Sequence, residues 1–202
     1  MSKGRLEAFS DGVIAILITI MVLELHTPAG TSWHALGHEL PVLLTYVLSF
    51  VFLGIYWNNH HHMFAAVSQI RGTVLWANLH LLFWLSLIPF STAWMSEHRF
   101  PPIPTALYGV VLLAAAIAYL ILQATLIRAE GENSQLRLAL GSDAKGKISA
   151  LLYCSGIALA FADRWLGLAV YVVVALVWLV PDRRVERHLT TAPPSQPHDR
   201  AE

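Results

Sequence analysis

RLEAFSDGVIAILITIMVLEL, residues Arg5–Leu25, is the stretch that decides the fold. Most of its residues are apolar, so the segment can enter a lipid bilayer as a helix. It also carries Ser10, Asp11, Thr19 and Glu24, and ionisable groups at membrane depth are costly unless they face protein or water. We therefore expect a transmembrane helix that contacts other protein, and not an anchor surrounded by lipid.

The two faces of this helix differ. At about 100° per residue, positions i, i+3, i+4 and i+7 fall on one stripe of a helix. Here that stripe consists of Ile16, Thr19, Ile20 and Leu23. Ordinary packing between helices is the commoner explanation of such a stripe. Asp11 projects roughly 140° away from the stripe, so its carboxylate must find partners on neighbouring helices.

The composition places the chain in the membrane. Of its 202 residues 56% are hydrophobic and 13% are charged, which is far more apolar than a soluble domain of that length. The apolar runs predict an all-α, polytopic membrane bundle. Lys and Arg balance Asp and Glu, so no basic field suggests nucleic acid as a partner. The single cysteine, Cys154, cannot form an internal disulfide, and its apolar surroundings do not suggest a metal site.

Six transmembrane segments can be counted, at residues 8–25, 40–57, 74–95, 105–127, 148–162 and 165–181. The last two are short and are separated by a minimal turn. With the N-terminus inside, eleven of the thirteen Lys and Arg residues are cytoplasmic, so the positive-inside rule places both termini in the cytoplasm. We expect residues 1–181 to form one domain and the Pro-rich residues 182–202 to be a disordered cytoplasmic tail.

A polar cluster is predicted on the cytoplasmic side, where span one begins, span two ends and span three begins. It contains Arg5, Ser10 and Asp11 from span one, Trp57, Asn58, Asn59, His60, His61 and His62 from span two, and Asn78 and His80 from span three. A buried carboxylate at that depth needs hydrogen-bond donors. For Asp11 the available donors are His60, Asn78 and Arg5.

Three interpretations of the cluster compete. A metal-dependent hydrolase would use the histidines and Asp11 as ligands, but His60, His61 and His62 point about 100° apart and no H-E-x-x-H pair occurs. A transporter would use Asp11 and His60 as a proton relay. A structural clamp would fix helix one against spans two and three. We favour the clamp, because most buried polar groups serve packing.

Three stretches of the sequence carry a family resemblance. Arg5-x-x-x-Phe9-Ser10-Asp11-Gly12, before an aliphatic helix, resembles the FSD signature of the bacterial relatives of the lysosomal potassium channel, the transmembrane protein 175 family. Trp57-x-x-His60-x-x-x-Phe64 is similar to that family at the end of span two, as is Asn78 with the Leu87-Ile88-Pro89-Phe90 context in span three. The resemblance covers most of the chain.

The resemblance implies a potassium-permeable cation channel, not an enzyme, in the bacterial plasma membrane, without cofactors. It implies homotetramers in which span one lines the pore. Ile16 would then form the narrowest apolar ring, with Thr19, Ile20 and Leu23 as neighbouring rings. The structural network of the family would consist of Arg5, Phe9, Ser10, Asp11, Trp57, His60 and Asn78. This chain departs from the family pattern at His61, His62 and Met63, and at Ile20, where many relatives have leucine.

Such a pore has simple physics. A ring of isoleucines can close by excluding water, and a nearby threonine ring offers hydroxyl dipoles to a partly dehydrated ion. Apolar rings supply no oxygen ligands, so we predict a modest preference for K⁺ over Na⁺. The alternatives to a channel are a proton-coupled transporter that uses Asp11 and His60, and a membrane assembly protein that transports nothing.

Overall fold

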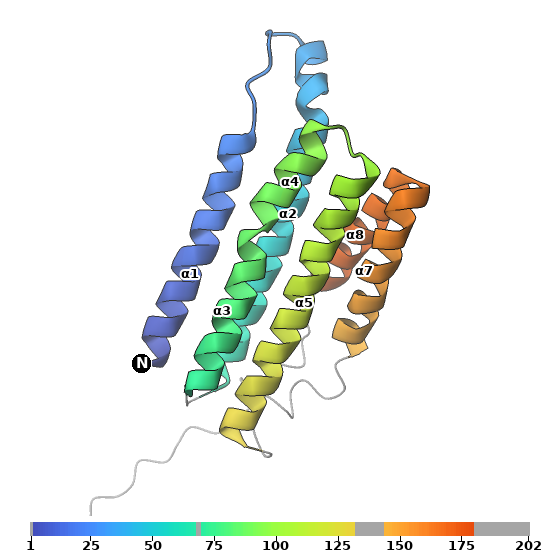
Figure 1. Ribbon diagram of the computed structural model, residues 1–202. Coiled ribbons are helices and arrows are strands. Elements are labelled where there is room, and N and C mark those ends of the chain that lie inside the picture. Colours follow the sequence, from blue (N-terminus) through green and yellow to red (C-terminus); the bar gives the residue numbers. More distant parts are fainter. Residues whose placement is uncertain (1, 68–69, 132–143, 180–202) are drawn as a thin grey trace, which may run out of the picture.

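The computed structural model describes residues 2–67, 70–131 and 144–179, and within these ranges every regular element is helical. Figure 1 shows the helices lying side by side with their axes roughly aligned. Their bounds are α1 Lys3–Ile20 with the 3₁₀ turn η1 Met21–Glu24, α2 Trp33–Ala65, α3 Gly72–Ser86, α4 Ile88–Glu97, α5 Pro102–Glu130, α7 Ala144–Ala162 and α8 Arg164–Leu179. The predicted tail, 182–202, lies outside the described residues.

The predicted all-helical membrane architecture is confirmed. Four helical segments are long and apolar enough to cross a bilayer: Lys3–Glu24, Trp33–Ala65, Gly72–Glu97 and Pro102–Glu130. At 1.5 Å per residue α7 and α8 extend about 28 and 24 Å, slightly less than the roughly 30 Å of a typical hydrocarbon core. α2 is much longer than its predicted span, since it continues beyond residues 40–57 at both ends.

The third predicted span is one rod broken near its middle. α3 ends at Ser86 and α4 begins at Ile88. Pro89, in the first turn of α4, has no N–H to donate to the carbonyl four residues earlier, and its ring crowds that carbonyl. The proline therefore explains a break that apolar periodicity alone does not reveal.

A tight hairpin joins α7 to α8, as the sequence predicts. Only Asp163 lies between them, and its Oδ1 accepts hydrogen bonds from the backbone N–H groups of Trp165 (2.7 Å) and Leu166 (3.3 Å). This is an N-cap for α8. The absence of a side chain at Gly167 allows the two helices to approach closely, because a Cβ there would lie 3.0 Å from the carbonyl oxygen of Gly156 and from the Cα of Ala160.

Gly156 provides a test of this packing. A Cβ at Gly156 would meet the buried ring of Tyr171, whose hydroxyl donates to the Thr105 carbonyl at 3.3 Å. We expect Gly156→Ala to lower the free energy of unfolding by about 1–3 kcal/mol, the usual cost of overpacking. The measurement is unfolding of the purified protein in a denaturing detergent.

Gly54→Ala is the matched control for that substitution, since a Cβ at Gly54 would have no neighbour within 4 Å. It should leave stability unchanged or raise it slightly, because alanine favours the helix. Equal losses in the two variants would contradict the packing described for α7 and α8.

α1 stands at one edge of the bundle (Figure 1), where it contacts α2 and α3. α7 and α8 lie on the far side, against α5 and each other. Helix α1 is thus covered by the rest of the chain on one side only. This position determines which of its side chains remain available to a second subunit or to a pore.

Candidate pore face and its supporting network

The buried face of α1 differs from the stripe identified in the sequence. Its residues are Leu6, Ser10, Ile14 and Leu17, continued in η1 by Met21. The stripe lies on the opposite side: Ile16 is 62%, Ile20 44% and Leu23 80% exposed. Within one chain the stripe is therefore left largely uncovered.

Thr19 lies within the exposed stripe. Its hydroxyl donates to carbonyl oxygens of its own helix, at 3.1 Å for Ala15 and 3.0 Å for Ile16. Because the proton is directed toward the helix backbone, the lone pairs of Oγ1 are free to face outward. A hydroxyl held in this way presents an oxygen to a cation.

A chain of buried hydrogen bonds ties α1 to α2 and α3. His60 Nε2 lies 2.8 Å from Asn78 Oδ1, and Asn78 Nδ2 donates to Ser10 Oγ at 2.9 Å. Ser10 Oγ in turn donates to the Leu6 carbonyl at 2.9 Å. Ser10, His60 and Asn78 are each at most 1% exposed, so these bonds are shielded from competition by water.

The directions of the bonds determine the tautomer of His60. Because the Ser10 proton goes to a carbonyl, its oxygen must accept, and the NH₂ of Asn78 must be the donor. The Asn78 oxygen therefore faces His60, whose Nε2 must carry a proton and donate it. His60 is also stacked on Phe64, with ring centroids 4.4 Å apart.

Asp11 has a different partner from those expected. Its Oδ1 accepts a hydrogen bond from the indole N–H of Trp57 at 3.0 Å. The prediction that His60, Asn78 and Arg5 supply the donors is wrong. The half-buried carboxylate is bonded to Trp57, whereas His60 and Asn78 bond to each other and Asn78 to Ser10. The buried network and the Asp11–Trp57 pair are thus two separate links between α1 and its neighbours.

The structure does not bring Arg5 and Phe9 into the buried network. Both are exposed, and in the part of the chain that the structure describes Arg5 makes no ion pair or side-chain hydrogen bond. On a helical wheel both lie on the same side of α1 as Ile16. Within one chain they therefore belong to its uncovered face.

A second buried polar group was not predicted. Ser49 Oγ on α2 lies 2.7 Å from Thr92 Oγ1 on α4 and 3.0 Å from the Tyr108 hydroxyl on α5. Thr92 donates onward to the Ile88 carbonyl at 2.7 Å. Isolated hydroxyls within apolar runs were the available signal, but nothing in the sequence shows that they meet.

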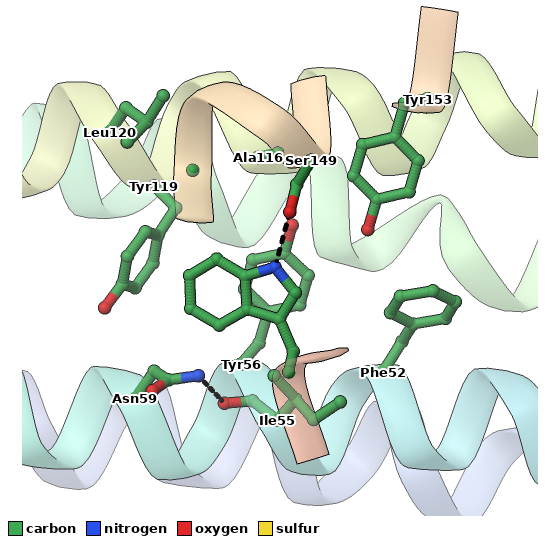
Figure 2. A pocket seen from close by; sticks show the side chains of 11 residues that line it. Phe52, Ile55, Tyr56, Asn59, Ala116, Tyr119, Leu120, Ser149 and Tyr153 are labelled. Atoms are coloured by element: carbon green, nitrogen blue, oxygen red, sulfur yellow. Dashed lines mark hydrogen bonds between the residues drawn. The ribbon is translucent and has the colours of Figure 1, made fainter. Parts of the chain in front are cut away.

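A small pocket lies among α2, α5, α7 and α8. Figure 2 shows Phe52, Tyr56 and Asn59 facing Tyr119 and Tyr153 across it. Trp178 closes one side and donates to Ser149 Oγ at 2.7 Å. The volume of the pocket, about 40 Å³, is far below the 300–1,000 Å³ of typical small-molecule sites, so we assign the pocket no ligand.

Comparisons with known proteins show what the whole chain is similar to. The family model described as "Endosomal/lysosomal potassium channel TMEM175" matches residues 5–89. A potassium channel of Chryseobacterium sp. (strain P1-3) is 54% identical over 189 residues, which are 94% of this chain and 98% of that protein. The chain belongs to the TMEM175 family.

Two further relatives match most of the chain. A potassium channel of Streptomyces collinus is 34% identical over 87% of this chain and 91% of its own length. The crystal structure of a lysosomal potassium-selective channel TMEM175 homolog from Chamaesiphon minutus superimposes with a TM-score of 0.76 at 29% identity, over 89% of this chain and 97% of that one. The fold and the membership of a channel family, not an enzyme family, are therefore established.

A TMEM175 protein of mouse, described as an endosomal/lysosomal proton channel, is 33% identical over 103 residues, 45% of this chain but 21% of its own length. The stretch that the family model matches, residues 5–89, contains the stripe on α1, both links to α2 and α3, and the proline break. The residues that the family model matches thus include every candidate residue from Arg5 to Asn78.

Proposed function

We propose that this chain is the subunit of a potassium-permeable channel in the bacterial plasma membrane, with its pore at an oligomer axis lined by α1. The full-length relatives are named potassium channels. The observation that carries the proposal is the uncovered stripe of α1, which faces away from α2 and α3. A single chain cannot enclose a pore with such a face, so several copies must do so, and we propose four.

In this assembly Ile16 forms the narrowest ring. Four isoleucine side chains around an axis exclude water when they meet, which closes the pore by dewetting. Thr19 lies one turn further along and offers hydroxyl oxygens to the ion. Ile20 and Leu23 complete the apolar lining toward the outer end. Because no ring replaces the full hydration shell, the preference for K⁺ over Na⁺ is modest.

The proposed topology follows the positive-inside rule. Both termini are cytoplasmic. The buried network and the Asp11–Trp57 pair hold the cytoplasmic half of α1 at a fixed position against α2 and α3. We propose that residues 1–181 act as one channel domain.

The test is potassium flux from liposomes that contain the purified protein. With K⁺ more concentrated inside the liposomes than outside, we expect rapid K⁺ efflux without an ionophore. The flux should be slower when Na⁺ replaces K⁺. Valinomycin added afterwards reports the total trapped K⁺. Flux that occurs only under an imposed proton gradient would contradict the channel and support the transporter that uses Asp11 and His60.

Asp11→Asn separates the two functions at the residue level. Asparagine keeps a carbonyl oxygen that accepts the Trp57 N–H bond but removes the proton-binding carboxylate. We expect K⁺ flux to remain within about twofold of the unmodified protein, because a partly exposed charged hydrogen bond contributes little. Complete loss of flux in a variant that still assembles would instead identify Asp11 as part of a proton relay.

A further inference from the structure

Two histidines lie one turn apart at the outer end of α2. His34 and His38 are both exposed, and their rings meet edge to face with centroids 4.8 Å apart. The neighbouring Ser32 caps the helix by accepting a hydrogen bond from the Ala35 N–H at 3.2 Å. The pair is therefore mounted on an ordered first turn, at an end of the molecule remote from the buried network.

We propose that His34 and His38 form a binding site for a divalent transition-metal ion such as Cu²⁺, Ni²⁺ or Zn²⁺. Residues at i and i+4 share one face of a helix, so small rotations of the two side chains bring one ring nitrogen of each to the same ion. Imidazole nitrogens suit these metals, and Cu²⁺ binds most tightly in the series. Water or a group from another subunit completes the coordination.

The surroundings define the strength of this site. In the described ranges no three His, Cys, Asp or Glu side chains converge on one point, so the ion has two protein ligands and binds reversibly. Glu39 follows His38 directly and points about 100° away on the helix. The positive end of the helix dipole weakens cation binding by less than about tenfold. The affinity that two metal–nitrogen bonds contribute is larger than this loss.

The test is titration of the full-length protein in detergent micelles with Cu²⁺, followed by electron paramagnetic resonance. The chain has ten histidines, so the readout is the difference between variants with the same histidine count. In Leu36→His/His38→Ala the two histidines stand at i and i+2, about 200° apart. Leu36 is exposed, so the exchange should not disturb folding.

We expect the unmodified protein to bind one Cu²⁺ at least about tenfold more tightly than this spacing variant, because chelation makes the second bond intramolecular. Gly37→His/His38→Ala restores a pair at i and i+3, and a side chain at Gly37 meets no atom within 4 Å, so tight binding should return. Equal Cu²⁺ affinity in all three proteins would overturn the proposal. The result is independent of the pore, since it is read as binding and not as flux.

Discussion

Ile16→Asn should raise potassium flux at least about tenfold and reduce the preference for K⁺ over Na⁺, which corresponds to lowering the barrier in the pore by about 1.4 kcal/mol. A ring of four isoleucines resists wetting, whereas asparagine side chains hydrogen-bond to water and keep the constriction hydrated. A hydrated constriction admits both ions with their shells largely intact. The measurement is flux from liposomes under K⁺ and Na⁺ gradients of equal size.

Ile117→Asn is the matched control for the Ile16 substitution. Ile117 is also an exposed isoleucine of a membrane helix, 45% exposed on α5, but it lies outside the proposed pore face. Flux through this variant should equal that of the unmodified protein once the amount of reconstituted protein is matched. Unchanged flux and selectivity in Ile16→Asn would show that Ile16 does not form the constriction.

Asn78→Ala should have the largest effect on stability of any change in the buried network. Among the described residues, Asn78 joins the network across helices, since it hydrogen-bonds to Ser10 Oγ on α1 and to His60 Nε2 on α2. Its removal leaves a buried imidazole N–H without an acceptor, so we expect a loss of about 2–3 kcal/mol in the free energy of unfolding. The measurement is unfolding in a denaturing detergent, together with the yield of assembled protein.

Asn59→Ala serves as the control for Asn78. The Asn59 amide donates to the Ile55 carbonyl of its own helix at 2.9 Å, and its loss affects no contact between helices. This variant should lose less than about 1 kcal/mol, near the average for hydrogen bonds in membrane proteins. If Asn78→Ala were equally mild, the network would not be what holds α1 in place.

Much of the fold could be predicted from the sequence, because apolar runs of membrane length have few alternative structures. The tight turn at Asp163 and the grouping of Ser10 with His60 and Asn78 were also accessible. Topology places the ends of adjacent spans at the same depth, and buried polar side chains must pair with one another.

What could not be predicted depends on rotation and register. Periodicity separates the face of α1 that contains Ile16 from the one that contains Ser10, but both are apolar enough to pack, and only the structure shows which is covered. The prediction of the hydrogen-bond donors to Asp11 was wrong for the same reason. Trp57 is rotated toward Asp11, whereas His60, three residues further along α2, points into the bundle. The meeting of Ser49 with Thr92 and Tyr108 depends on three helix registers at once.

Thiol modification tests most directly whether ions pass along the uncovered face of α1. The single cysteine, Cys154, is exposed and is first replaced in Cys154→Ala. Thr19→Cys and Ile117→Cys are then introduced separately into that background. Each protein is treated with Ag⁺, an ion of the same charge as K⁺ that binds thiolates.

Ag⁺ should reduce potassium flux through the Thr19→Cys protein to less than about a tenth, since a metal bound to a pore-facing thiol obstructs the ion path. Flux through the Ile117→Cys protein should not change. Mass spectrometry of both proteins confirms that the thiols have reacted. Full modification of the Thr19→Cys protein with undiminished flux would contradict a pore lined by α1.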